Sequence, residues 1–455
     1  MKTELNIYQK RVEGMTYLDK RMLNHRDRTH LLQANLNRKA KEEKGYVFYV
    51  LYDKVFLPYI LRYAWDEVRK NGGSAGVDGE TVQDVSGGDV DAYLDALSED
   101  LRRQTYKPSA VKRVWIPKSN GEKRPLGIPT VRDRIVQAAC KLIIEPIFEA
   151  DFEESSYGFR PERSAGDAIR AIRASLQAGN TTVYDADLSK YFDTIPHGKL
   201  LQVLKKRISD PRVLRLIKLW LKAPVSDRGN LTGGKRNKVG TPQGCVISPL
   251  LANIYMNLID KAVNRLRGYF QPYGIKIIRY ADDFILTGRD IGQHTVSCLK
   301  HLLARTGLRI NETKTKLLNA RTAEFNFLGF TFRYDASLYG TGQYLNIHPG
   351  KKALGKIKEK IHEYLHTHGH SRAETVSAGL NMIIKGWLNY FDLPGCSYTQ
   401  MTRRHLRWYM SEQLYRYYRR KSQRRSSLYG QQAYEILISK YGLVDVLKYR
   451  PPTQF

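Results

Sequence analysis

The chain has 455 residues, of which 42% are hydrophobic, so it is long enough to form two or three globular domains. Its 75 Lys and Arg residues outnumber its 45 Asp and Glu residues and leave a formal net charge of +30. This surplus favours a polyanionic partner such as nucleic acid, because basic side chains release the counterions that condense on phosphates. No run approaches the roughly 18–20 apolar residues that span a bilayer, so we expect no membrane partner.

The N-terminus and the cysteines indicate the cellular compartment. The sequence MKTELNIYQKRVEG has no apolar core and includes acidic residues, so we expect neither a secretory signal nor a transit peptide. The four cysteines are far apart and form no CxxC pair. We therefore predict free thiols in a reducing compartment, a cytoplasmic protein, and no structural zinc site.

The first 180 residues predict helices followed by alternating strands and helices. Residues 1 to about 70 are rich in Lys, Arg and Tyr and predict helices, which end at the Gly-rich loop 71–80. Beyond this loop, strands are predicted at 111–118 and 181–188, and helices at 133–152 and 164–177.

The second half begins with a predicted hairpin and ends in basic helices. Apolar runs at 275–281 and 284–288 indicate the two strands of the hairpin. A helix near 292–305 and the apolar run FNFLGFTF (325–332) follow. After Gly350 the composition changes, and basic helices are predicted from 350 to 365 and from about 400 to 425. We place a domain boundary near 335–350.

Asp282 and Asp283 stand at the tip of the predicted hairpin, in the sequence RYADDFILTG. A β-turn alone is one explanation, since Asp tolerates turn geometry and bonds its own backbone. A metal site is the alternative, because a cation neutralises two adjacent like charges. Asp187 ends another predicted strand, where it either caps the next helix or joins this pair. Two Mg²⁺ ions bridged by carboxylates from two strands would serve in-line attack on a phosphate.

Two further segments carry residues that suit a triphosphate. IPKSNGEKRPLGIP (116–129) places Lys118, Lys123 and Arg124 around an Asn-Gly turn, which predicts either a hairpin folded over phosphates or a solvated basic hairpin. GTPQGCVISPLLANIYMN (240–257) places Gly244 before a predicted helix. A side chain there would block the close approach of a base pair or backbone, although a simple helix start also explains the glycine.

Two short motifs match other functions only formally. GNLTGGKR (229–236) has the glycines and lysine of a phosphate-binding loop, but Arg236 stands where Ser or Thr should hold Mg²⁺. We interpret it as a flexible basic loop. HEYLH (362–366) matches a zinc-protease helix, but its lysine-rich surroundings disfavour a dication. We interpret it as a solvated helical face.

In combination, the motifs resemble those of the group II intron reverse transcriptases, also called maturases. The resemblance covers residues 99–391 and runs in order through IPKSNGEKRPLGIPTVRDRIVQ, SSYGFRPERSAGDAI, DADLSKYFD, GTPQGCVISPLLANIYMN, YADD, LRINETKTK, FNFLGF and GWLNYF. It implies an α+β right-hand polymerase, with fingers and palm around an antiparallel sheet and a following α-helical thumb or maturase domain. The implied ranges are 1–80 for an RNA-binding N-terminal fingers extension, 81–337 for fingers and palm, and 338–455 for the thumb with its basic aromatic C-terminal region.

The resemblance also assigns roles to individual residues. Asp187, Asp282 and Asp283 resemble the catalytic, metal-binding triad, with the Leu188 carbonyl as an additional metal ligand. The implied cofactor is two Mg²⁺ ions per site, with Mn²⁺ as a substitute. Phe192 resembles the steric gate that selects deoxynucleotides. The implied contacts to the dNTP are Lys118, Arg124, Phe192, Gln243, Gly244 and Lys314.

The C-terminal region indicates RNA binding independently of the resemblance. Residues 401–425 interleave Arg and Lys with Trp and Tyr, and this mixture serves both phosphates and unstacked bases. A basic thumb helix whose aromatic residues form a core is the other explanation, and both can hold. The RNA contacts that we predict are Arg403, Arg404, Arg407, Arg416, Arg419 and Arg420.

The resemblance finally implies a function and its partners. The chain resembles the short members without an endonuclease, which implies insertion at single-stranded target DNA. We expect an RNA-directed DNA polymerase that extends a DNA or RNA primer on an RNA template with dNTPs. We also expect a maturase that binds group II intron RNA, promotes splicing and supports retrohoming, as a nucleoid-associated ribonucleoprotein of the bacterial cytoplasm. One alternative is a reverse transcriptase recruited to host defence. The other is a splicing-only RNA-binding cofactor, and the intact aspartates argue against this second alternative.

Overall fold

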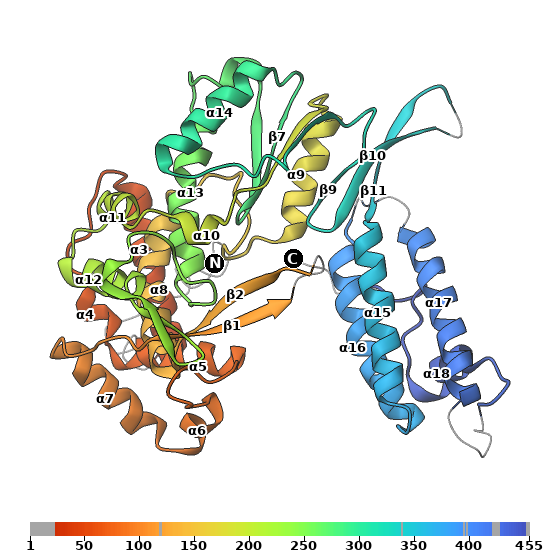
Figure 1. The fold of residues 1–455 in the computed structure, drawn as a ribbon, viewed down its shortest axis with the longest axis horizontal. Coiled ribbons are helices and arrows are strands. Elements are labelled where there is room, and N and C mark those ends of the chain that lie inside the picture. The colour runs from red at the N-terminus through yellow and green to blue at the C-terminus, as the bar shows by residue number, and fades with distance from the viewer. Residues whose placement is uncertain are drawn as a thin grey trace. The chain divides into compact units, whose positions relative to one another are not determined.

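The structure is a computed structural model that describes residues 23–117, 121–337, 340–394, 396, 399–420 and 428–451. The chain divides into two compact units, and Figure 1 labels most of their helices and several of their strands. The first unit contains the described residues up to Ser164, Ala186–Leu286 and Ile291–Lys316. The second contains Ala165–Asp185, Thr287–Asp290 and the described residues from Leu317 onward. This mixture of helices and sheets confirms the predicted α+β class.

The N-terminal helices of the first unit pack on α8 (Val131–Glu149), which confirms the helix predicted at 133–152. Pro146 lies inside α8 and has no N–H for the Leu142 carbonyl one turn earlier. Gln33 of α3 (His25–Glu42) replaces it, since its Nε2 donates to that carbonyl at 3.0 Å. The neighbouring helices are α4 (Tyr52–Val55), α5 (Pro58–Asn71), α6 (Val82–Gly87) and α7 (Val90–Arg102).

One four-stranded sheet has the order β2-β1-β4-β5. β1 (Val111–Pro117) and β2 (Lys123–Ile128) are antiparallel, while β4 (Pro224–Asp227) runs parallel to β1. β5 (Asn230–Gly233) pairs antiparallel with β4 and precedes a 3₁₀ turn at Gly234–Arg236. The GNLTGGKR segment is therefore not a flexible loop. Its strand has only exposed side chains, so no apolar pattern marks it.

A second four-stranded sheet has the order β6-β7-β3-β8. β6 (Lys276–Tyr280) and β7 (Asp283–Gly288) occupy the two predicted hairpin strands, and β3 (Thr182–Ala186) is the strand predicted at 181–188; β8 spans Lys316–Asn319. The helices of this part of the chain are α9 (Ala165–Gln177), α10 (Tyr191–Thr194), α11 (His197–Lys205), α12 (Pro211–Leu221), α13 (Ser248–Asn264) and α14 (Gln293–Thr306), with a 3₁₀ turn at Gln271–Tyr273.

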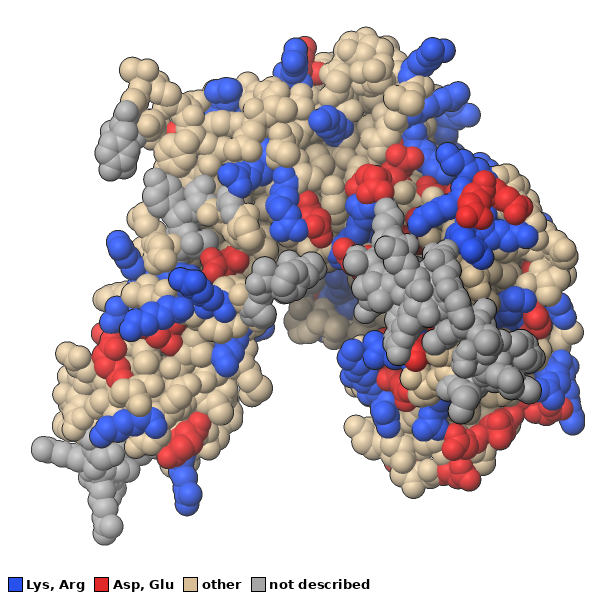
Figure 2. Space-filling view, turned by 180° about the vertical axis from the view of Figure 1, so that it is seen from behind, with Lys and Arg blue, Asp and Glu red and all other residues tan. Residues whose placement is uncertain are grey.

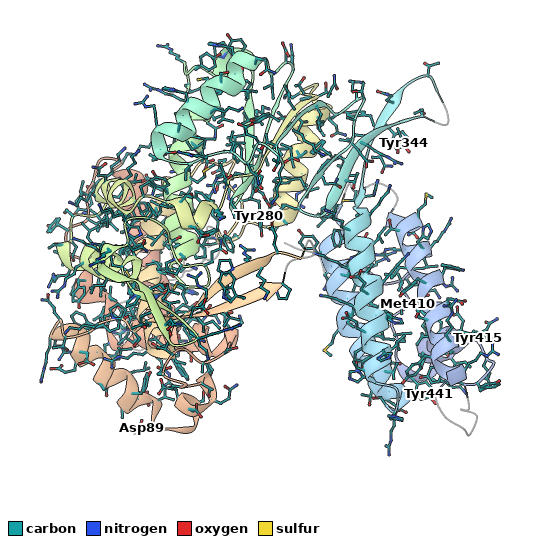
Figure 3. The ribbon with its side chains drawn as sticks, viewed as in Figure 1. Asp89, Tyr280, Tyr344, Met410, Tyr415 and Tyr441 are labelled. Carbon is teal, nitrogen blue, oxygen red and sulfur yellow. The ribbon has the colours of Figure 1, made fainter. Side chains whose placement is uncertain are left out.

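The C-terminal part of the second unit combines a small sheet with four helices. The sheet has the order β11-β10-β9 and is formed by β9 (Phe325–Phe327), β10 (Phe330–Ala336) and β11 (Gln343–Pro349). The helices share one hydrophobic core, in which Met410 (labelled in Figure 3) is completely buried. They are α15 (Lys351–Thr367), α16 (Ala373–Phe391), α17 (Thr399–Arg420) and α18 (Ala433–Tyr441). Among the described helices, none is long and apolar enough to cross a membrane.

All four cysteines are free, as predicted. Cys140 and Cys245 are buried, and burial raises the pKa of each thiol to about 12. Cys298 and Cys396 are half-buried. Burial raises the pKa of Cys396 to about 11 and shifts the pKa of Cys298 upward.

Candidate active site

The two aspartates of the YADD motif follow a strained turn. Tyr280, labelled in Figure 3, ends β6, and Asp283 begins β7. Between them Ala281 adopts a φ of +59°, a left-handed conformation that residues other than glycine rarely take. Asp282 is half-buried and Asp283 is exposed. Such a conformation persists only where the surrounding structure holds it.

A buried ion pair holds this turn. The side chains of Arg279 and Asp260 are both 0% exposed, and Arg279 Nη2 lies 2.6 Å from Asp260 Oδ2. Arg279 Nη1 donates to the Ala281 carbonyl at 2.9 Å and so fixes the turn directly. The same guanidinium bonds Asn253 Oδ1 at 2.8 Å and Ser156 Oγ at 2.6 Å. A buried charge is tolerated here because it is both paired and hydrogen-bonded.

Gly158, in the SYGFRP motif, lies against the same turn. A Cβ atom on Gly158 would be 2.5 Å from the Ala281 backbone nitrogen, which leaves no space for a side chain. Asn253 Nδ2 donates to the Gly158 carbonyl at 2.7 Å, so one asparagine bonds both Gly158 and Arg279. The YADD turn is therefore supported by contacts on two of its sides.

Asp187 is held by the NETKTK segment. Lys314 Nζ is 3.4 Å and Asn311 Nδ2 is 3.2 Å from Asp187 Oδ2, and the Asn311 N–H donates to the Asp187 carbonyl at 2.8 Å. Leu188 forms an antiparallel bridge with Ile310. The two hydrogen bonds of this bridge are made by the backbone groups of the residues on either side of Leu188 and Ile310, and not by Leu188 itself. The Leu188 carbonyl consequently points away from that segment.

The electrostatics of Asp282 favour a bound cation. Burial raises the pKa of its carboxyl above the usual range, and the charge of Asp187 raises this pKa further, while Arg124 and Arg279 lower it. A cation shared by the two carboxylates would offset both the burial and the repulsion, and oxygen ligands suit Mg²⁺. Within the described ranges, no group of three or more His, Cys, Asp and Glu side chains is arranged to hold a metal ion. Asp187 and Asp282 are thus close enough for their charges to interact, but the three aspartates do not form one cluster among the described residues.

Arg124, Gln243 and Gly244 meet beside the β1–β2 hairpin. Arg124 Nε donates to Gln243 Oε1 at 2.8 Å, and the Gly127 N–H donates to the Gln243 carbonyl at 2.5 Å. Gly244 has a φ of +105°, and a Cβ atom there would be 2.3 Å from the Gly127 carbonyl oxygen. The close approach predicted at Gly244 is therefore made by the backbone of Gly127. Lys118 lies outside the described residues.

Phe192 is buried in α10, and its backbone is hydrogen-bonded to the segment that precedes Gln243 and Gly244. Its carbonyl accepts a hydrogen bond of 2.6 Å from the Thr241 N–H, two residues before Gln243. Sequence reasoning missed Thr241 as well as Arg279, Asp260 and Asn311. Arg279 carried a signal, since it is a single charge at the end of the apolar run before YADD; the others depend on partners distant in the sequence.

The arginines predicted to contact RNA fall into two groups. Arg403 pairs with Asp392 and donates to the carbonyls of Val446 and Tyr449 at 2.8 and 2.7 Å. This buried residue connects α17 to the C-terminal segment, which contradicts its predicted RNA contact. Of the others, Arg404 is exposed, Arg407 and Arg416 form ion pairs with Glu435 and Glu412, Arg419 lies over the Tyr415 ring, and the Arg420 side chain is outside the described residues.

Basic side chains are also found well beyond α17. On the face drawn in Figure 2, Lys and Arg side chains are distributed over the surface and alternate with Asp and Glu. On this face, the basic side chains therefore do not gather into a single patch. The exposed residues of α17 nevertheless include the aromatic side chains of Trp408 and Tyr415, the latter labelled in Figure 3.

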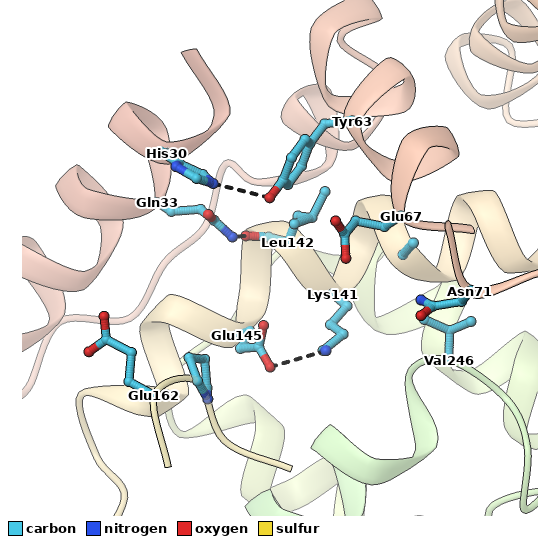
Figure 4. Close-up of a pocket in the computed structure, with 12 residues that line it drawn as sticks. His30, Gln33, Tyr63, Glu67, Asn71, Lys141, Leu142, Glu145, Glu162 and Val246 are labelled. Carbon is cyan, nitrogen blue, oxygen red and sulfur yellow. Dashed lines mark hydrogen bonds and ion pairs between the residues drawn. The ribbon is translucent and has the colours of Figure 1, made fainter. Parts of the chain in front are cut away.

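Two other candidate sites carry no catalytic arrangement. In HEYLH, the rings of His362 and His366 lie 6.4 Å apart on α15, and His362 Nδ1 is 3.4 Å from Gln413 Oε1. A polar pocket of about 340 Å³ lies between α3, α5 and α8 (Figure 4). Two pairs of its polar side chains bond each other, since His30 contacts Tyr63 and Lys141 pairs with Glu145. Both features are accounted for by packing.

Carboxylates near a strained turn, beside a basic hairpin and a glycine-containing turn, are typical of nucleotidyl-transfer enzymes of the polymerase class. Residues 116–332 match the family described as reverse transcriptase (RNA-dependent DNA polymerase), and residues 354–431 match the group II intron, maturase-specific domain. The chain belongs to the group II intron-encoded reverse transcriptases and carries their maturase-specific domain.

Three relatives show how far the similarity extends. Protein YkfC of Escherichia coli is 37% identical over 295 residues, which cover 57% of this chain and 76% of YkfC. The group II intron-encoded protein LtrA of Lactococcus lactis is 35% identical over 53% of this chain and 40% of LtrA. A 91 kDa protein in the cob intron of Schizosaccharomyces pombe is 28% identical over 65% of this chain and 43% of that protein. The chain thus spans less than half of the last two relatives.

Proposed function

We propose that this chain copies RNA into DNA with Asp187, Asp282, Asp283 and the Leu188 carbonyl as ligands of two Mg²⁺ ions, for which Mn²⁺ can substitute. The observation that carries the proposal is the electrostatic coupling between Asp187, which follows β3, and Asp282, which is half-buried and held by the strained turn. When bound, the metal ions would activate the primer 3′-hydroxyl and stabilise the leaving pyrophosphate. The rigid turn keeps the carboxylates in place without reorganisation during the reaction.

The residues around the carboxylates are proposed to receive the dNTP. Arg124 lies within the electrostatic field of Asp282 and is oriented by Gln243, so it is available for the triphosphate. Phe192 and Gly244 would shape the sugar and base positions as steric gate and close-approach turn. Lys314 neutralises Asp187 and could turn to a bound triphosphate, because its side chain is 59% exposed. Lys118 completes this proposed set.

The second part of the proposed function is binding of RNA during splicing. The maturase-specific match and the relatives support group II intron RNA as the partner. We propose that the described α17 arginines other than Arg403 contribute to this contact, and that an RNA template, its primer and a target DNA complete the retrohoming reaction. The proposed location is the bacterial cytoplasm, in a nucleoid-associated ribonucleoprotein. The proposed domains are the N-terminal extension (1–80), fingers and palm (81–337) and thumb (338–455).

Primer extension on an RNA template tests the polymerase. The wild type should incorporate dNTPs with Mg²⁺, and Asp282→Asn should reduce the rate at least about 10³-fold, because several kcal/mol of transition-state stabilisation depend on the metal. Asp290→Asn is the matched control, since Asp290 is an exposed aspartate after β7. Synthesis by Asp282→Asn at the control rate would refute the assignment. A wild type that binds intron RNA but makes no DNA would favour the splicing-only function.

A further inference from the structure

A groove between α15 and α16, within the second unit, has no role in the polymerase site. Its volume is about 830 Å³. Lys352, Lys356 and Lys360 line it from α15, and Met382, Trp387 and Tyr390 are among the residues that line it from α16. We refer to it below as the α15–α16 groove.

The apolar wall of the α15–α16 groove is both exposed and rigid. Met382 is 75% exposed and Tyr390 is 39% exposed. The Tyr390 hydroxyl donates to the Leu328 carbonyl at 3.0 Å, and the Trp387 ring packs on Phe391 with centroids 4.8 Å apart. These contacts fix the aromatic rings at the edge of the groove, where a planar group could stack on them.

The opposite wall of the groove is cationic. The three lysines recur every four residues and therefore form one row, with about 6 Å along the helix axis between neighbours. Among the described residues that line the groove, three are lysines and none carries a carboxylate. The groove therefore combines a row of positive charges with an apolar, aromatic surface.

We infer that the α15–α16 groove binds an unpaired, single-stranded RNA segment, with its phosphates on the lysine row and a base against the aromatic wall. This inference rests on the proposed RNA-binding function and names the form of RNA that the groove takes. Single strands offer base faces to aromatic side chains, whereas a duplex keeps its bases stacked inside. An acidic partner without planar groups would leave the aromatic wall unused, and an apolar helix would leave the lysines unpaired.

Binding of a single-stranded uridine oligonucleotide to the full chain tests the charged wall. Lys356→Glu should weaken binding about tenfold and reduce the salt dependence, because each phosphate contact to a single strand contributes about 0.7 to the slope of log K against log salt. Lys385→Glu makes the same charge change at an exposed position of α16 that does not line the groove. Equal losses of affinity in both variants, or an equal loss in the affinity of Lys356→Glu for an RNA duplex of the same length, would overturn the inference.

Tryptophan fluorescence tests the aromatic wall. The oligonucleotide should quench part of the wild-type emission, and Trp387→Phe should remove that part and weaken binding by up to tenfold. The substitution is mild, since the Trp387 indole N–H has no hydrogen-bond partner among the described residues. Unchanged quenching in this variant would contradict stacking in the groove.

Primer extension by the same proteins separates this inference from the proposed function. Normal DNA synthesis together with no groove-specific loss of binding would refute the groove alone. Groove-specific binding by a protein that makes no DNA would refute the polymerase alone.

Discussion

Arg279 beside the YADD turn and Arg403 in α17 are both buried arginines, but they serve different neighbours. Arg279 bonds Asp260 and the carbonyl of the strained residue Ala281, so its buried charge fixes two aspartates nearer the surface. Arg403 bonds Asp392 and the carbonyls of the C-terminal segment, so its charge closes the core of its own unit. The adjacent Arg404 is exposed and can meet another partner.

This difference separates two requirements. A metal site needs carboxylates that do not move during the reaction, so its charge is supported from inside by a saturated hydrogen-bond network. A surface for RNA needs charges that can adapt to the backbone, and exposed side chains supply them. Buried and exposed basic residues therefore indicate different functions, even where the sequence places them in one run.

The largest expected effect is at Arg279. Arg279→Gln leaves Asp260 buried without its partner and should lower the free energy of unfolding by about 3–5 kcal/mol, as measured by urea denaturation. Arg289→Gln, at an exposed position, should change it by less than about 0.5 kcal/mol. The double variant Arg279→Met, Asp260→Leu should recover stability but not primer extension, because nothing then holds the Ala281 carbonyl. Recovered activity would show that the ion pair does not position the turn.

Arg403 provides the contrasting measurement. Arg403→Ala should lower the free energy of unfolding by about 2–3 kcal/mol, because charged hydrogen bonds to Asp392 and to backbone carbonyls are lost. It should leave the salt dependence of RNA binding unchanged. The adjacent exposed Arg404→Ala should do the opposite, with little loss of stability and a smaller salt slope. If only Arg403→Ala reduced the salt dependence of RNA binding, the RNA contact would belong to Arg403 and not to Arg404.

Gly158 tests whether packing also positions the turn. Gly158→Ala places a methyl group against the Ala281 nitrogen and should cost about 1–3 kcal/mol through overpacking. Primer extension should fall more than the stability loss explains, since Asp282 moves with the turn. Gly198→Ala is the control, because no atom lies within 4 Å of a Cβ there. Equal activity in the two folded variants would show that the turn tolerates displacement.

The smallest effect concerns His197, whose Nε2 donates to the Gly240 carbonyl at 2.7 Å. Burial lowers the pKa of His197 below its usual range, so the unfolded chain binds its proton more readily than the folded chain. This contribution to stability is complete above the unfolded pKa and is lost as the pH falls below it. His197→Gln keeps an N–H donor and should flatten the dependence of thermal unfolding on pH between about 5 and 7. An unchanged pH dependence would contradict this role.

The sequence predicted a strand or helix correctly where an apolar pattern or a motif within that segment marks it. It predicted β6, β7 and α8 because their buried residues form largely apolar runs, short in the two strands and long in the helix. It did not predict β5, whose side chains are all exposed, so no apolar pattern marks the strand that pairs with β4.

In the site, the motifs identified Asp187, Asp282 and Arg124, but they did not identify the residues whose hydrogen bonds position these side chains. Asn311 reaches Asp187 across 124 positions of sequence, and Arg279 reaches Ser156 across 123. Contacts of this kind are tertiary, so no local pattern contains them. The Arg403 prediction failed for a related reason, since exposed and buried arginines look alike in a basic run.

The graded burial of the four thiols has a practical consequence. A thiol reagent reacts with the thiolate, so a raised pKa and a closed surrounding both protect a cysteine. Half-buried Cys298 should react first, whereas Cys140 and Cys245, in the first unit, should react only when their core opens. Cys396 belongs to the second unit, so its rate of alkylation should depend on the opening of that unit. Pulsed alkylation read by mass spectrometry can therefore follow the opening of each unit separately, with no residue replaced and no dye attached.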